Sequence, residues 1–149
     1  MKLVIFEGMD GTGKTTLRKK FEHKSKYKHT VIDRFTGSAI VYDEIYGRKS
    51  NKNSHLIFET KLKEIIDVYL VYLFCDRDIL RKRLKKKKDI ISKEDLDKAD
   101  TLYDEYLDDT SFKLIGIDTG RDTISKSVDK IVKFVENGKW SLLIDLDIY

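Results

Sequence analysis

The chain has 149 residues, of which 40% are hydrophobic and 38% charged, and its formal net charge is +4. This length predicts a single domain with one substantial core, and no segment is apolar for long enough to span a membrane. Cys75 is the only cysteine, which excludes an intrachain disulfide, and without a signal-peptide pattern we expect a cytoplasmic protein.

A phosphate-binding motif opens the chain. Residues 2–7 are a short apolar run typical of a buried strand, residues 8–15 match G-x-x-x-x-G-K-[ST], and residues 15–21 have helical spacing. Glycines let successive backbone N–H groups converge on a polyphosphate, at a helix N-terminus whose dipole favours anions. Lys14 is predicted to reach the β- and γ-phosphates of ATP, and the Thr15 hydroxyl to complete the shell of a bound Mg²⁺. The predicted ATP-binding residues are Gly8, Met9, Asp10, Gly11, Thr12, Gly13, Lys14, Thr15 and Thr16.

A second polar pair follows the next predicted strand, residues 30–33, which ends in Asp33 and Arg34. Ligands of open parallel sheets bind beyond the carboxyl ends of the strands, so this pair should face the same crevice as the motif. Asp33 could hold Mg²⁺ through water or take a proton from an attacking hydroxyl, and Arg34 could clamp a second phosphate. The alternative is a strand-end pair that serves solubility or a turn.

The middle of the chain predicts helices over residues 37–47 and 55–66, separated by a polar loop at 50–54. The second helix should bury one face, formed by Leu56, Phe58, Leu62, Ile65 and Ile66. Residues 68–74 are apolar throughout and predict a strand covered on both faces. Asp76 is placed to cap a basic helix that runs from Arg77 to about Lys88.

The last third predicts a helix over residues 93–108, a strand over 113–118 and a helix over 122–136, closed by Asn137 and Gly138. The inward face of the final helix should comprise Ile124, Val128, Ile131, Val132 and Val135. The apolar tail, residues 138–149, is expected to dock as a strand or on a partner chain. Alternating strands and helices predict an α/β fold of three layers, a parallel sheet flanked by helices as in P-loop NTPases, in one domain over residues 1–149.

Several segments resemble one family in order. Residues 6–16 are similar to the F-E-G-x-D-G-x-G-K-T-T loop of thymidylate kinases and related deoxynucleotide kinases. Asp33-Arg34-Phe35, with Ser38 and Tyr42, resembles their D-R-Y/F-x-x-S-x-x-x-Y segment, and residues 68–84 resemble the strand and helix before their mobile lid. The resemblance covers most of residues 1–137 and implies a reduced nucleoside-monophosphate-kinase fold that uses ATP and Mg²⁺.

This resemblance also implies roles for individual residues. Asp10 would contact the sugar 3′-hydroxyl of the acceptor, Asp33 would organise Mg²⁺ and water, and Arg34 would hold the acceptor or the transferred phosphate. Phe35 and Tyr42 are expected to contact the acceptor. Together with Tyr46 and Phe58 they could stack on its base, and the alternative is that these rings pack in helices over the sheet. The basic segment at about 81–93 would be a lid, from which Arg81, Arg83 or a lysine would reach the phosphates, and a homodimer remains open.

The chain departs from the family at the acceptor side. Fewer than twenty residues separate Thr16 from Asp33, where thymidylate kinases have a long stretch that includes a further arginine-bearing strand end. The favoured acceptor is a deoxynucleoside monophosphate. The alternatives are a nucleoside, a polynucleotide 5′-hydroxyl or a modified DNA base, with nucleic acid then a partner. A regulatory nucleotide-binding protein is less favoured, because no N-K-x-D-like segment for guanine is present.

Overall fold

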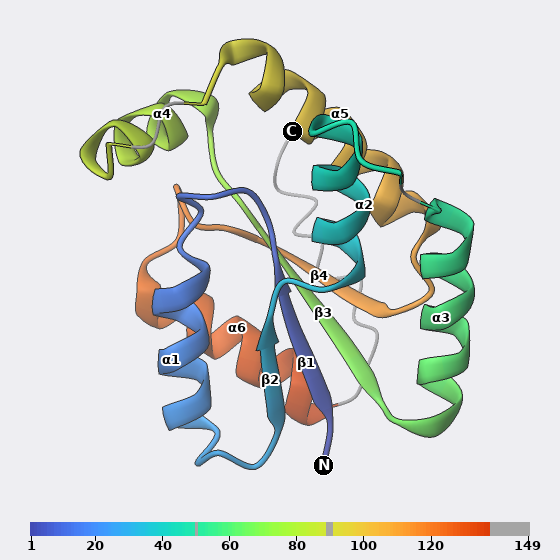
Figure 1. Cartoon of the computed structure of the whole chain (residues 1–149). Helices are drawn as coiled ribbons and strands as arrows, with labels where there is room; N and C mark the ends of the chain where they lie inside the picture. The colour runs from blue at the N-terminus through green and yellow to red at the C-terminus, as the bar shows by residue number, and fades with distance from the viewer. Residues whose placement is uncertain (50, 89–90, 138–149) are drawn as a thin grey trace.

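The computed structural model describes residues 1–49, 51–88 and 91–137. Within this part of the chain a parallel sheet has the strand order β2-β1-β3-β4 (Figure 1). The strands are β1 (Leu3–Glu7), β2 (Thr30–Asp33), β3 (Val68–Phe74) and β4 (Lys113–Asp118). The helices are α1 (Lys14–Lys24), α2 (Thr36–Ile45), α3 (Lys52–Ile65), α4 (Arg77–Lys86), α5 (Lys93–Asp109) and α6 (Ile124–Asn137).

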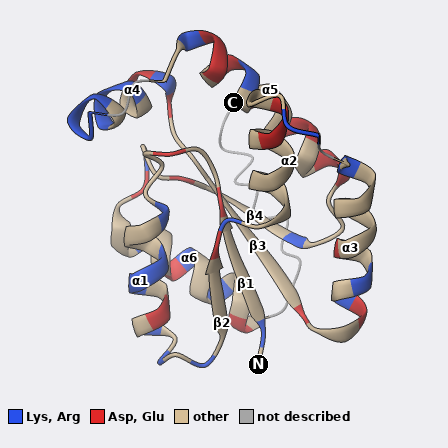
Figure 2. Ribbon diagram, viewed as in Figure 1, with Lys and Arg blue, Asp and Glu red and all other residues tan. Residues whose placement is uncertain are grey.

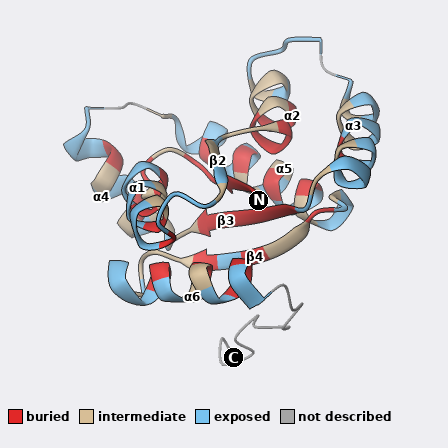
Figure 3. Ribbon diagram, turned by 90° about the horizontal axis from the view of Figure 1, so that it is seen from below, coloured by how far each residue is buried: buried red, intermediate tan, exposed pale blue. Residues whose placement is uncertain are grey.

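Helices cover both faces of the sheet. Alternate residues of β1 and β3 point to opposite sides, so Ile5 and Leu70 belong to one apolar cluster and Phe6 and Val71 to another. The first cluster includes side chains of α2, α4 and α5, and the second includes side chains of α1 and α6. Figure 3 shows α2 and α5 on one side of the sheet and α6 on the other. The predicted three-layer α/β fold is therefore confirmed.

The helix boundaries correct the sequence analysis in the middle of the chain. The segment 50–54 was expected to be a loop, but α3 begins at Lys52, because the Asn51 side chain accepts a hydrogen bond from the Ser54 backbone N–H at 3.1 Å. Two predicted helices are also shorter in the structure. The helix predicted to reach about Lys88 is α4, which ends at Lys86, and the helix predicted from residue 122 is α6, which begins at Ile124. Asp76 caps α4 as predicted, accepting from the Asp78 N–H at 2.9 Å.

Three apolar residues that were expected to face inward are exposed. Ile65 is 84% exposed, and Phe58 and Ile124 are about half exposed. Phe58 and Ile65 are exposed because α3 lies beside α2, away from the middle of the sheet, where only part of its surface meets another element (Figure 1). The buried residue of α3 is instead Glu59, which accepts hydrogen bonds from the hydroxyls of Thr36, Tyr106 and Thr110.

Two predictions extend past the described residues. The helix end at Gly138 and the docking of the tail 138–149 lie outside them, and so does part of the predicted lid, residues 89–90. None of the described helices has both the length and the apolar character needed to cross a bilayer.

The carboxyl ends of the strands bring the polar motifs to one edge. Phe6 of β1 is paired in register with Asp33 of β2, and Glu7 with Tyr72 of β3. The glycine-rich loop leaves β1 at this edge, and Thr119 follows β4 there, where its backbone N–H donates to the Phe74 carbonyl at 2.8 Å. The residues of the site therefore come from segments far apart in the sequence.

Candidate active site

The glycine-rich loop has a backbone that requires glycine. Gly8, Gly11 and Gly13 have φ values of 140°, 82° and 96°, in the range that side-chain-bearing residues rarely adopt. A Cβ on Gly8 would lie 2.3 Å from the Leu73 carbonyl oxygen of β3, and one on Gly11 would crowd Leu80 of α4 at 3.2 Å. The loop therefore fits closely between β3 and α4 and leads into α1, which is the strand–loop–helix context that the motif predicted.

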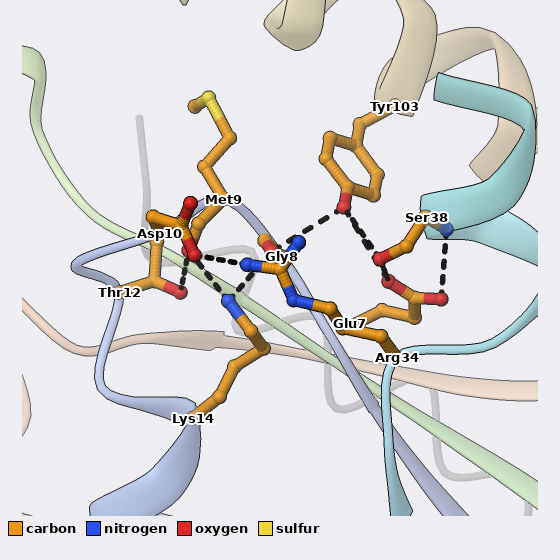
Figure 4. A network of polar contacts seen from close by, with 9 residues as sticks. All are labelled: Glu7, Gly8, Met9, Asp10, Thr12, Lys14, Arg34, Ser38 and Tyr103. Atoms are coloured by element: carbon orange, nitrogen blue, oxygen red, sulfur yellow. Dashed lines mark hydrogen bonds and ion pairs between the residues drawn. The ribbon is translucent and has the colours of Figure 1, made fainter. Parts of the chain in front are cut away.

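Lys14 is buried and folds over the loop. Its Nζ donates to the carbonyl oxygens of Gly8 and Met9, both at 2.7 Å (Figure 4). Burial, with a further contribution from the nearby Arg34 guanidinium, lowers the pKa of Lys14 to about 8. Carbonyl dipoles only partly replace the hydration of the ammonium, so a negatively charged ligand such as a phosphate would stabilise it further.

Arg34 lies across from Lys14 with an unusual backbone. Its φ is 67°, and its N–H donates to the Phe6 carbonyl at 2.9 Å. The guanidinium pairs with Asp10 of the loop (Figure 4). It also lies 5.1 Å from the ring centroid of Tyr42. The structure therefore brings together Asp10, Arg34 and Tyr42, three of the four residues predicted for the acceptor.

Glu7, which no motif assigned to a role, holds the segment that follows Arg34 in place. The carboxylate is fully buried and accepts from the backbone N–H groups of Phe35 and Ser38 at 2.7 and 2.9 Å, and from the Ser38 hydroxyl at 2.5 Å. The Tyr103 hydroxyl of α5 adds a bond of 3.4 Å. Glu7 thus holds the start of α2, next to Arg34. An acidic residue in an otherwise apolar strand was the signal that could have revealed it.

A hollow of about 300 Å³ opens on the Asp10 side of the loop. It is lined by Met9, Asp10, Tyr42, Ile45, Tyr46, Ile91, Asp95, Leu96 and Ala99. The rings of Tyr42 and Tyr46 stack at 6.0 Å with an interplanar angle of 22°, so they form an aromatic wall. We call this the acceptor hollow; apolar and aromatic walls with a few polar groups are usual in small-molecule sites.

A second hollow of about 340 Å³, the donor hollow, lies on the other side of the same loop. Gly11, Thr12 and Gly13 line it together with Arg83 of α4. Arg83 is held by the Gly11 carbonyl at 3.2 Å and by the Thr119 carbonyl and hydroxyl at 2.8 and 3.0 Å. Thr119, which belongs to no recognised motif, therefore fixes a predicted lid arginine beside the loop.

The other predicted residues lie farther from these contacts. Arg81 lines a separate hollow with Leu84 and Lys88 on another face of α4, so its catalytic role stays a prediction. The Phe35 ring packs against Phe58 at 5.8 Å, so its contact with an acceptor also stays a prediction.

Thr15 and Asp33 provide the oxygen ligands that Mg²⁺ prefers. Thr15 is exposed in the first turn of α1, and Asp33 is exposed at the end of β2. The Asp33 carboxylate is near enough to Lys14 to oppose the effect of burial on its pKa. A hydroxyl and a carboxylate fit an ion that takes its other ligands from phosphates and water, and this assignment stays a prediction.

No family model matches the chain. The SPβ prophage-derived uncharacterized protein YorR of Bacillus subtilis (strain 168) is 30% identical over 127 residues, which is 79% of this chain and 74% of YorR. The chain belongs to the YorR family. A crystal structure of YorR in complex with phosphorylated GDP has a TM-score of 0.80 and 25% identity, and the match covers 92% of this chain and 97% of that one.

A nucleoside kinase and a nucleotide kinase share the fold. Deoxyadenosine kinase of M. mycoides, with dCMP and a flexible dCDP bound, has a TM-score of 0.65 at 12% identity over 92% of this chain and 100% of that one. Thymidylate kinase of Candida albicans has a TM-score of 0.60 at 15% identity over 92% of each chain. The prediction of a P-loop kinase is confirmed at the level of the fold. Membership of the thymidylate kinase group stays a prediction.

Proposed function

We propose that this protein is an Mg²⁺- and ATP-dependent phosphotransferase that acts on a nucleotide-type acceptor. One observation carries the proposal: consecutive residues of the glycine-rich loop divide between two hollows, with Met9 and Asp10 in the acceptor hollow and Gly11 to Gly13 in the donor hollow. A γ-phosphate held by the loop would lie between them. The kinase fold and the nucleotide bound to the relative YorR support this reading.

The chemistry requires positioning and charge neutralisation. The bond from the γ-phosphorus to the bridging oxygen breaks and leaves ADP, while a new bond forms from the γ-phosphorus to an acceptor oxygen. Lys14 would bind the β- and γ-phosphates, and Arg34 would leave Asp10 to hold the acceptor or the transferred group. Bound Mg²⁺, held by Thr15 and Asp33, would offset phosphate charge during transfer.

The first candidate acceptor is a deoxynucleoside monophosphate. Its base would lie against the Tyr42–Tyr46 wall, Asp10 would accept from the sugar hydroxyl, and its phosphate would meet Arg34. A monophosphate oxygen attacks without a proton to lose, so this reaction does not need Asp33 as a base.

The second candidate is a hydroxyl acceptor, such as a nucleoside or a 5′-hydroxyl end. The residues that line the acceptor hollow include two carboxylates, Asp10 and Asp95, and no lysine or arginine within the described part of the chain. Arg34 is already paired with Asp10. A neutral acceptor avoids repulsion by these carboxylates, and its hydroxyl proton would pass to Asp33.

The test is ADP release from Mg²⁺-ATP with separate acceptors: deoxynucleoside and guanosine monophosphates, nucleosides, and 5′-hydroxyl DNA and RNA oligomers. Stimulation by a monophosphate supports the first candidate. Stimulation only by hydroxyl acceptors supports the second. Lys14→Ala should lower either activity by orders of magnitude, whereas Lys61→Ala, an exposed lysine of α3, should not. Release indifferent to every acceptor contradicts the proposed function.

A further inference from the structure

A shallow groove of about 1250 Å³ runs between α1 and the start of α6, on the sheet face opposite the acceptor hollow. Its basic and aromatic lining comprises Lys19, Lys20, His23, Lys24, Lys26 and Tyr27. Ile124 of α6 is about half exposed and supplies apolar surface, and it also borders the donor hollow. We call this feature the α1–α6 groove.

The positive charge of the α1–α6 groove is largely uncompensated. Lys24 pairs with Asp129, but within the described residues Lys19, Lys20 and Lys26 form no ion pair with an acid, and no acidic residue lines the groove. Lysine and arginine gather on α1 and α4, whereas acidic residues gather on α5, across the molecule (Figure 2). A concentration of like charge on one side raises the local concentration of anions.

Tyr27 adds an exposed aromatic ring to the groove, which a surface of solvated lysines alone would not have. The residue is 71% exposed, and its ring meets that of His23 edge-on with the centroids 6.5 Å apart. Lys26 and Tyr27 both have left-handed backbones, with φ values of 55° and 56°, and the Tyr27 N–H donates to the Glu22 carbonyl at 2.9 Å. Two successive non-glycine residues in this conformation cost free energy, and here they turn the chain out of α1 and keep an aromatic ring beside the lysines.

We propose that the α1–α6 groove binds single-stranded nucleic acid, with phosphates on its four lysines and a base stacked on Tyr27. Bases stack on exposed aromatic rings in a sequence-tolerant way, while a basic groove follows the backbone. An acidic polypeptide would satisfy the lysines but leave the ring of Tyr27 unused. Because Ile124 belongs to both sites, a strand in the groove passes beside the donor hollow. The binding does not depend on phosphotransfer.

The test is fluorescence anisotropy of labelled DNA and RNA strands of about 16 nucleotides, without ATP, over a salt series. Four neutralised phosphates predict a slope of about −3 for log K against log salt. Lys19→Glu/Lys20→Glu should weaken binding at least about tenfold and reduce the slope by about 1.4. Tyr27→Ala should weaken binding by about 5- to 150-fold while the slope stays constant.

The matched control is Lys49→Glu/Lys61→Glu, which makes the same charge change at two exposed positions outside the groove and should bind like the unaltered protein. Circular dichroism checks that every variant is folded. The proposal is overturned by absence of binding at low salt, by an equal loss in the control, or by an unchanged affinity in Tyr27→Ala. Equal competition by poly-glutamate also overturns it, because the groove would then select charge alone.

Discussion

Two buried charges, Glu7 and Lys14, organise the site at the scale of single residues. Glu7 accepts from two backbone N–H groups and two hydroxyls, so its charge is compensated inside the fold. Lys14 donates to the carbonyls of Gly8 and Met9, and its pKa falls because burial disfavours the ammonium more than the nearby carboxylates favour it. The first residue therefore serves structure, and the second is suited to meet an anion.

The pKa of Lys14 predicts how ATP binding depends on pH. Phosphates bind the ammonium form, so ATP affinity should fall above pH 8, by up to about tenfold per pH unit. Calorimetric titrations from pH 6.5 to 9.5 measure this fall. Lys14→Arg keeps its positive charge throughout this pH range, so its ATP affinity should not fall above pH 8. An equal fall in both proteins would assign the pH dependence to another group.

The same pKa has a consequence for stability. The folded-state pKa of about 8 lies below the usual 10.5, so the unfolded chain binds more protons between these values. Stability should therefore rise as pH increases from 8 to 10.5, and the cost of the buried charge is fully present below pH 8. Lys14→Met should raise the urea midpoint at pH 7, and a lowered midpoint would contradict this.

Glu7→Gln tests the structural role of the other charge. The amide places an NH₂ group against N–H and O–H groups that donate hydrogen bonds to the carboxylate in the unaltered protein. We therefore expect the free energy of unfolding to fall by about 2–3 kcal/mol. The start of α2 should loosen, and the acceptor KM should rise more than that for ATP. Glu64→Gln, on the exposed surface of α3, is the control for urea unfolding. Equal urea midpoints in Glu7→Gln and Glu64→Gln would contradict the structural role of Glu7.

At the scale of elements, α4 decides how the basic segment meets the loop. Leu80 and Leu84 pack against the sheet, and a Cβ on Gly11 would touch both. This packing turns Arg83 toward Gly11 and Thr119, while Arg81, two residues earlier and about 200° around the helix, faces another hollow.

The two arginines of α4 give a matched pair of variants. Arg83→Ala should raise the KM for ATP about tenfold, because it removes a guanidinium beside the donor hollow, with little effect on the acceptor KM. Arg81→Ala should change the donor KM less than twofold. Steady-state kinetics with each substrate varied distinguishes them, and a larger effect of Arg81→Ala would reverse the assignment.

At the scale of the whole molecule, the sheet joins two apolar clusters into one unit. β2 and β4 are the outer strands of the described sheet, and the central strands β1 and β3 contribute to both clusters. A change on either face should therefore destabilise the entire fold, as expected for a single domain.

Leu70→Ala and Leu73→Ala test this coupling. Both residues are fully buried in β3, but they belong to opposite clusters. Each change should lower unfolding free energy by about 2–5 kcal/mol in one transition, coincident by far-ultraviolet circular dichroism and tyrosine fluorescence. Two separate transitions would indicate two folding units.

The sequence by itself determined the strands, the glycine-rich loop and the position of Asp33 and Arg34, because these depend on local patterns. Continuous apolar runs specify buried strands, and the parallel order brings their polar ends to one edge. Only the tertiary structure decided that Arg83 meets the loop, that Glu7 holds α2, and that Ile65 and Ile124 stay exposed. Periodicity shows which face of a helix is apolar, whereas the neighbours that cover this face depend on how all the elements pack together.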